Sequence, residues 1–109
     1  MSAVLFAAQR LSAAILALAV FVHLGTILYA VRGGLTADEI LGRTHGNVGV
    51  MAFYALFVVA VTVHVPIGLR TVLREWTQWR GRSLDLALIL LAILLLGLGL
   101  RAVYAVTLA

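Results

Sequence analysis

Three apolar segments, each about as long as a membrane-spanning helix, constrain the fold of this chain more than any other feature. They cover approximately residues 8–31, 46–72 and 84–107 of the 109 residues, and none alternates between apolar and polar residues as a strand would. A helix needs about 20 apolar residues to cross the hydrocarbon core of a bilayer. Hydrophobic residues make up 64% of the chain, more than a soluble domain of this length could bury. The sequence predicts an all-α integral membrane protein whose three transmembrane helices form one anchor domain, residues 1–109.

Charged residues predict how the chain crosses the membrane. The chain has eight arginines, no lysine and four acidic residues. Four arginines lie in the last residues of the second apolar segment and in the connection to the third, namely Arg70, Arg74, Arg80 and Arg82, whereas two arginines and two acids lie between the first and second. Because basic residues are enriched in cytoplasmic loops, we expect a multi-pass protein of the inner (cytoplasmic) membrane with its N-terminus in the cytoplasm and its C-terminus outside. Arginines that flank apolar segments favour contact with membrane lipid and no nucleic-acid partner.

Two histidines lie within the predicted spans, His23 in the first and His64 in the second. A neutral imidazole in hydrocarbon needs a partner for its N–H group and a role for its other nitrogen. One interpretation is a hydrogen bond to a neighbouring helix. The other is axial ligation of a haem iron, since histidine is a common axial ligand and helix bundles form suitable haem pockets. Position alone leaves both interpretations open.

The two histidines are expected at different depths in the membrane. His23 follows Arg10 by 13 residues, about 20 Å of helix, and His64 precedes Arg70 by six residues, about 9 Å. If both arginines mark the cytoplasmic boundary, the two depths differ by about 10 Å. The histidines of one chain therefore cannot ligate the same iron. If both are ligands, they imply two haems, each completed by a histidine from another subunit.

Polar residues at the cytoplasmic ends of the first two spans form a second candidate group: Arg10, Ser12, Arg70, Arg74 and Glu75. Topology and lipid phosphates explain the arginines without any further function. The alternative is that they pair with haem propionates and donate hydrogen bonds to a quinone, because arginine stays charged and presents a rigid fork of donors.

Proline and glycine residues predict local features of the helices. Gly33 and Gly34 are expected to end the first helix. Pro66 removes a backbone donor, and we expect the resulting kink to open space beside His64. Small residues on the helices, namely Gly25, Gly49 and Gly68, allow either close helix packing or room for a flat macrocycle. His45, in the outer loop, is interpreted as a surface residue, with contact to the propionate of a distal haem as the alternative.

Two short motifs resemble a known family. Residues 64–75, HVPIGLRTVLRE, resemble the motif His-x3-Gly-x-Arg-His-x3-Asp of the cytochrome b membrane-anchor subunits of succinate dehydrogenase and fumarate reductase. Residues 9–12, QRLS, are similar to the His-Arg-x-Ser-Gly motif at the start of that family's first helix. The sequence departs from these motifs at Gln9, Ala13, Thr71 and Glu75. Phe6 stands where single-haem members have a serine that contacts quinone.

The resemblance implies a role for each matching residue. His64 matches the axial ligand of haem b, and Arg10 matches an arginine at the quinone site and near a haem propionate. Ser12 matches the motif serine beside that arginine. Arg70 matches the arginine that follows the ligand helix toward the cytoplasm, and Glu75 keeps the charge of the motif aspartate.

The resemblance also extends to His23. In dihaem members of the family, the first and second helices each supply one histidine to haems at different depths. His23 and His64 are similar to that arrangement, which makes His23 the candidate axial ligand of a second haem iron.

These features together predict a non-catalytic subunit of an oxidoreductase complex. The chain has no nucleotide-binding loop, and without cysteine it cannot hold a Cys-ligated iron–sulfur cluster. The resemblance implies one or two haems b shared with a second anchor subunit, either a sister chain or an identical copy. It also implies a quinone as electron acceptor or donor, and flavoprotein and iron–sulfur subunits on the cytoplasmic side. A haem-free structural anchor and a small transporter subunit remain as alternatives.

Overall fold

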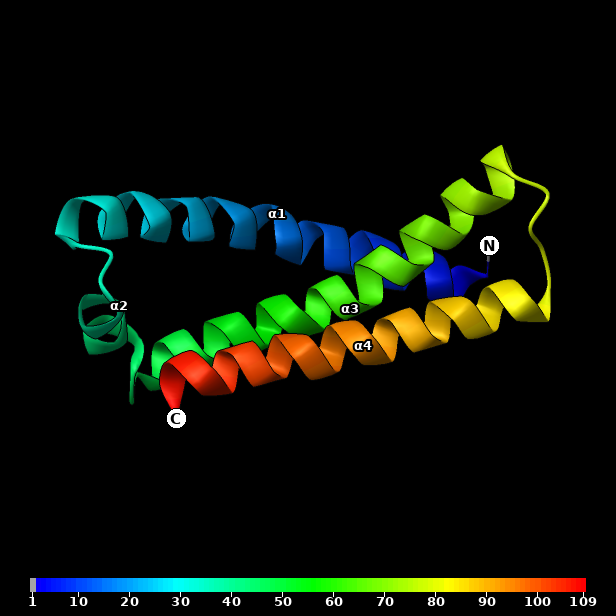
Figure 1. Cartoon of the computed structure of the whole chain (residues 1–109). Coiled ribbons are helices and arrows are strands. Elements are labelled where there is room, and N and C mark those ends of the chain that lie inside the picture. The colour runs from blue at the N-terminus through cyan, green and yellow to red at the C-terminus, as the bar shows by residue number, and fades with distance from the viewer. Residues whose placement is uncertain (1) are drawn as a thin grey trace.

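Helices connected by short turns form the part of the chain that the structure describes, residues 2–109. This computed structural model contains α1 (Ala3–Gly33), α2 (Ala37–Thr44), α3 (Val48–Trp76) and α4 (Arg82–Thr107). The long helices α1, α3 and α4 form an elongated bundle, and α2 is a short helix at the end of the bundle where the C-terminus lies (Figure 1). No strand occurs in residues 2–109. The predicted all-α fold is confirmed.

α1, α3 and α4 are each long and apolar enough to cross a membrane. They contain 31, 29 and 26 residues, against the ~20 that a bilayer core requires. The predicted spans lie within these helices or overlap them, although α1 begins at Ala3 and α3 continues to Trp76. At most 11% of the most apolar stretch of any of these helices is buried within the chain. Lipid or another protein must therefore cover the rest, as in a multi-pass membrane protein.

The connection between α1 and α3 contains a helix that the sequence analysis did not predict. α1 ends at the glycine pair as expected, because Gly34 adopts a φ of 114°. α2 then begins with a capping box, in which the Thr36 hydroxyl accepts a hydrogen bond from the Glu39 N–H at 3.2 Å and the Glu39 carboxylate accepts from the Thr36 N–H at 3.4 Å. A threonine followed three residues later by glutamate is a sequence signal for such a helix start.

Hydrogen bonds attach the end of α2 to the last turn of α4. The Thr44 hydroxyl donates to the carbonyl oxygen of Val106 at 2.7 Å, and the Gly46 N–H donates to the carbonyl oxygen of Thr107, also at 2.7 Å. Thr107 is almost fully buried by this contact. The carbonyls at the end of a helix lack partners within the helix, so these two bonds both hold α2 in place and complete the end of α4.

α3 lies between α1 and α4 and packs against both. The side of α1 that faces α3 is a stripe of residues spaced alternately by four and three positions: Leu5, Gln9, Ser12, Leu16, Ala19 and His23. All six are buried or half-buried. This spacing keeps one face of a helix against its neighbour, as in coiled coils and helix bundles. The stripe therefore brings both Ser12 and His23 against α3.

A glycine allows α3 and α4 to approach closely. A Cβ atom placed on Gly99 would lie 2.6 Å from Cγ1 of Val58 and 2.9 Å from its Cγ2. Leu88 and Val103 of α4 are buried on either side along the helix. Small residues at such crossings let the backbones of membrane helices come together, so Gly99 sets the separation of this pair.

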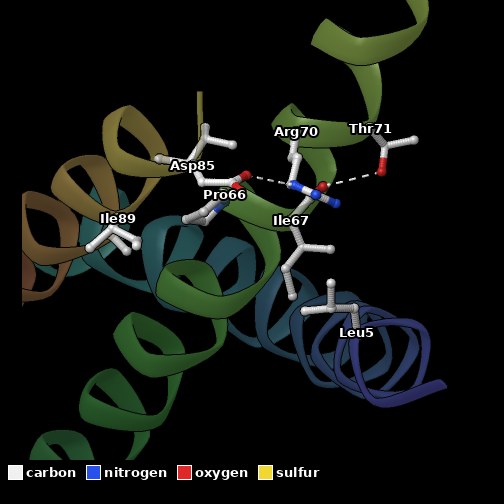
Figure 2. Close-up of a pocket in the computed structure, with 9 residues that line it drawn as sticks. Leu5, Pro66, Ile67, Arg70, Thr71, Asp85 and Ile89 are labelled. Carbon is white, nitrogen blue, oxygen red and sulfur yellow. Dashed lines mark hydrogen bonds and ion pairs between the residues drawn. The ribbon is translucent and has the colours of Figure 1, made fainter. Parts of the chain in front are cut away.

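Pro66 lies inside α3, which continues as a helix through it. Figure 1 shows that the C-terminal part of α3 turns away from α4. A pocket of about 380 Å³ opens beside Pro66 between α1, α3 and α4, with Arg70, Asp85 and Ile89 in its wall (Figure 2). His64 is not part of this wall. The space was expected beside His64. It lies instead beside Pro66, on the side of α3 that faces α4, because the bend separates these two helices.

Candidate functional site

The first candidate site is a polar layer between α1 and α3 around His64. The Nδ1 atom of His64 lies 3.4 Å from the Oγ atom of Ser12. Ser12 is only 4% exposed, and its hydroxyl also donates to the carbonyl oxygen of Gln9 at 3.1 Å. His64 itself is half-buried, and its Nε2 atom has no hydrogen-bond partner in residues 2–109. The layer thus joins two residues that the sequence analysis selected separately.

Gln9 and Gly68 lie about one turn away, toward the N-terminal end of α1 and the C-terminal end of α3. A Cβ atom on Gly68 would lie 3.0 Å from Nε2 of Gln9, so this glycine serves close packing between α3 and α1. The Oε1 atom of Gln9 is buried and has no hydrogen-bond partner within residues 2–109. A buried acceptor without a donor costs about 1–3 kcal/mol. A donor from a second molecule at this layer would recover that energy.

The second candidate site is an aromatic layer around His23. The Nδ1 atom of His23 lies 3.4 Å from the Tyr54 hydroxyl, and the ring packs edge-on against Tyr54 and Phe57 with centroids 5.8 and 5.6 Å away. The Thr26 hydroxyl donates to the backbone carbonyl of His23 at 2.7 Å and lies 3.4 Å from the Tyr54 hydroxyl. Neither Tyr54 nor Thr26 stands out in the sequence. Only the pairing of α1 with α3 reveals them.

A large cavity adjoins the His23 layer. Its volume is about 760 Å³, and its wall comes from α1, α2 and α3, including His23, Arg43 and Tyr54. Ligand pockets in proteins have volumes of about 300–1,000 Å³. Gly25 and Gly49 also line it, and a Cβ atom on Gly25 would meet no atom within 4 Å. Gly25 therefore does not serve close helix packing, because it borders open space.

The two histidine layers are separate. His64 faces Ser12, whereas His23 faces Tyr54, which precedes His64 by ten residues on α3. Ten residues of helix correspond to about 15 Å. The structure therefore does not bring the two imidazoles together within one chain. Each layer therefore contains one histidine. Residues 2–109 also contain no cluster of three or more histidine, cysteine or acidic side chains that could hold a metal ion.

The charged candidates at the N-terminal end of α1 and the C-terminal end of α3 are spread around one end of the bundle. Arg70 pairs through Nε with Oδ1 of Asp85 at 3.0 Å, and both side chains are partly exposed, at 33% and 50%. An exposed pair of this kind contributes about 0–1 kcal/mol to stability. Asp85 was not among the candidates predicted from the sequence, although an acid at the start of the third span, on the same side of the membrane as Arg70, is a usable signal.

The remaining charged candidates have other neighbours. The Arg10 guanidinium is exposed and lies 5.6 Å from the centroid of the Phe6 ring. Glu75 is exposed and borders a shallow pocket of about 320 Å³ together with Arg70, Arg74 and Arg80. No ion pair within residues 2–109 joins Arg10 to Glu75. Three arginines around one pocket can donate hydrogen bonds to an acidic group that binds there.

On the opposite end, Arg43 occupies the wall of the large cavity. Its guanidinium donates to the carbonyl oxygen of Gly34 at 2.7 Å and lies 5.8 Å from the centroid of the Tyr29 ring. The sequence analysis treated this arginine only as part of a loop. The neighbouring His45 is exposed, in agreement with its interpretation as a surface residue.

The fold and the two histidine layers define a class: a multi-pass, all-α membrane protein with single imidazoles held between α1 and α3. Comparison with protein families, curated proteins and solved structures finds no match for this chain.

Proposed function

We propose that this chain is a haem b-binding membrane-anchor subunit of a complex similar to succinate dehydrogenase and fumarate reductase, in which it passes electrons between iron–sulfur centres and a membrane quinone. The observation that carries the proposal is His64. Its imidazole lies in a membrane-spanning helix with Nδ1 on the buried Ser12 hydroxyl and with Nε2 unpartnered in residues 2–109. An imidazole held through one nitrogen and free at the other has the donor chemistry of an axial haem ligand.

The residues present fit a haem that is shared with another subunit. Each layer offers one imidazole, His64 in one and His23 in the other, and the two are about 15 Å apart along α3. A second axial ligand at either depth would have to come from a sister chain or an identical copy. The large uncovered apolar surface of the three helices offers room for such a partner. Bound haem would supply one-electron transfer at these two depths.

The arginines at the cytoplasmic end would bind and orient acidic or carbonyl groups. Arg70 uses Nε for Asp85, which leaves its two terminal nitrogens as donors toward a carboxylate such as a haem propionate. Arg10, which lies near the buried Ser12 on α1, would donate to a quinone carbonyl at the membrane surface. Flavoprotein and iron–sulfur subunits would dock on the same cytoplasmic end, where Arg74, Glu75 and Arg80 are exposed.

Haem content tests the proposal directly. The complex that contains this chain should be purified from its native membrane in mild detergent, and its reduced-minus-oxidised spectrum and its haem per anchor chain measured. We expect a haem b signal with one or two haems per pair of anchors. A complex that retains its dehydrogenase subunits and has no haem would reject the proposal and leave the haem-free structural anchor.

The proposed orientation can be tested by reporter fusions. An enzyme reporter that is active only outside the cytoplasm should be active when fused after Ala109 and inactive when fused after Arg80, because the arginine-rich connection between α3 and α4 is expected to stay inside. A reporter that fluoresces only in the cytoplasm should give the opposite pattern at the same two sites. The reverse result at both sites would place the arginine-rich connection outside and the quinone site with it.

Arg10 provides a test of the quinone site. We expect Arg10→Ala to lower quinone reductase activity about ten- to a hundred-fold, because a hydrogen bond from a charged donor contributes about 1.5–3 kcal/mol. Activity with an artificial dye that accepts electrons upstream of the anchor should stay unchanged. The matched control is Arg82→Ala, which removes an exposed arginine from the same end of the bundle. Equal losses with quinone and with dye would argue against a quinone contact.

A further inference from the structure

A hydroxyl group lies 3.4 Å from the Nδ1 atom of each intramembrane histidine, the Ser12 hydroxyl at His64 and the Tyr54 hydroxyl at His23. A serine, threonine or tyrosine hydroxyl has one hydrogen to donate, whereas its oxygen can accept a further bond. A backbone carbonyl can only accept. A neutral imidazole, the form that a membrane interior favours, has one N–H and one unprotonated nitrogen. In each layer a hydroxyl that donates to a backbone carbonyl has no hydrogen left for its other neighbour, and this fixes the direction of the remaining hydrogen bonds.

In the His64 layer, the Ser12 hydroxyl lies between a carbonyl and an imidazole. Its Oγ atom is 3.1 Å from the carbonyl oxygen of Gln9, and that contact requires the serine hydrogen. The same Oγ is 3.4 Å from Nδ1 of His64 and has no second hydrogen to donate there. The hydrogen in this contact must come from His64. His64 therefore carries its hydrogen on Nδ1, and Nε2 has a free lone pair.

The His23 layer gives the same result through one more hydroxyl. Thr26 donates its hydrogen to the carbonyl oxygen of His23 at 2.7 Å. The Tyr54 oxygen lies 3.4 Å both from Oγ1 of Thr26 and from Nδ1 of His23. All three contacts can be hydrogen bonds at the same time in one arrangement only. In that arrangement His23 Nδ1–H donates to the Tyr54 oxygen, and the Tyr54 hydroxyl donates to Oγ1 of Thr26. With the opposite tautomer, the Tyr54 hydrogen would go to His23, and the Tyr54 and Thr26 oxygens would face each other without one.

We propose that Ser12, and Tyr54 together with Thr26, are positioning residues that hold both intramembrane histidines as Nδ1–H tautomers and leave each Nε2 unprotonated. Both hydroxyl chains end on a carbonyl of α1, so the helix backbone sets the tautomer in each case. The assignment of iron as the occupant of Nε2 rests on the proposed function, whereas the tautomers do not depend on it. Ser12 then acts through His64 rather than by contact with a cofactor.

Nitrogen NMR of the histidine side chains tests the tautomers without any haem. The full chain, labelled with ¹⁵N at histidine and reconstituted without haem in phospholipid bilayers, should show protonated Nδ1 and unprotonated Nε2 for His23 and for His64. His45, which is exposed in the connection between α2 and α3, serves as the internal reference. A protonated Nε2 on either intramembrane histidine in the unaltered chain would overturn the proposal for that layer, and no variant is needed to obtain this result.

Two variants act as controls for each other. Ser12→Ala should allow His64 to adopt both neutral tautomers and leave the signals of His23 unchanged. Tyr54→Phe should allow His23 to adopt both neutral tautomers and leave the signals of His64 unchanged. Ser12→Thr keeps the hydroxyl and should preserve the His64 signal. A Ser12→Ala chain that keeps the His64 signal unchanged would contradict a positioning role for the serine.

The outcome is distinguishable from that of the proposed function. If the complex contains no haem and the tautomers are as expected, the proposed function fails and this inference stands. If haem is present, Ser12→Ala should shift its midpoint potential and weaken haem retention by about 10–100-fold, as is typical when a ligand loses its outer hydrogen bond. Haem bound with an unaltered potential in Ser12→Ala would count against the positioning role while leaving haem ligation intact.

Discussion

If this chain ligates haem b as proposed, replacing His64 with alanine should remove one haem completely from its complex. His64 is the one imidazole of its layer, and its neighbours there, Ser12 and Gln9, offer only hydroxyl and amide groups. These groups are poor substitutes for an imidazole as axial ligand of haem iron. The reduced-minus-oxidised spectrum and the haem content of purified His64→Ala complexes measure the effect. We expect the haem of this layer to be undetectable.

Two further variants show whether such a loss is specific. His45→Ala removes an exposed histidine outside the membrane-spanning helices and should leave the spectrum unchanged. His23→Ala should remove the second haem and leave the first titrating, because the two layers lie about 15 Å apart along α3. An unaltered spectrum in His64→Ala would show that this residue is only a hydrogen-bond partner between helices.

Gly99→Ala should destabilise the chain, and far more than the same change at Gly97, the other glycine of α4. The added Cβ would lie 2.6 and 2.9 Å from the two methyl groups of Val58, a short branched side chain that has little freedom to move aside. Overpacking of this kind costs about 1–3 kcal/mol. We expect the unfolding midpoint of the purified chain, titrated with a denaturing detergent in mixed micelles, to fall accordingly.

Gly97→Ala is the matched control, two residues earlier on the same helix. A Cβ atom there would meet nothing within 4 Å, and Gly97 is exposed. Alanine is up to about 1 kcal/mol better than glycine in a helix interior, so this variant should be as stable as the original chain or slightly more stable. Equal destabilisation by both variants would mean that α3 and α4 do not meet at Gly99.

The fold class followed from the sequence because the physical requirement is local. A run of some 20 apolar residues must satisfy its backbone groups internally, which only a helix does within one segment of chain. The turn at Gly33 and Gly34 was equally local. α2 was missed because an eight-residue helix has too few residues for a periodic pattern, although the capping residues Thr36 and Glu39 were a sufficient signal.

The candidate site depended on contacts between distant segments. His64 and His23 stood out in the sequence as polar residues in apolar spans. The residue that holds His64 lies 52 positions away, and the one that holds His23 lies 31 positions away. Which hydroxyl faces which ring depends on the register of α1 against α3. That register comes from interlocking side chains such as Gln9 against Gly68, which no pattern within a single helix reports.

The sequence by itself thus determined that the chain forms long apolar helices with few polar side chains. Hydropathy and the hydrogen bonding of backbone groups within a helix both depend on one continuous segment of the chain. Only the tertiary structure decided that the histidines occupy two separate layers, that Arg70 pairs with Asp85, and that Gly99 rather than Gly25 is a point of close packing. These features depend on helix register and crossing, which are set by the shapes of side chains on two helices at once.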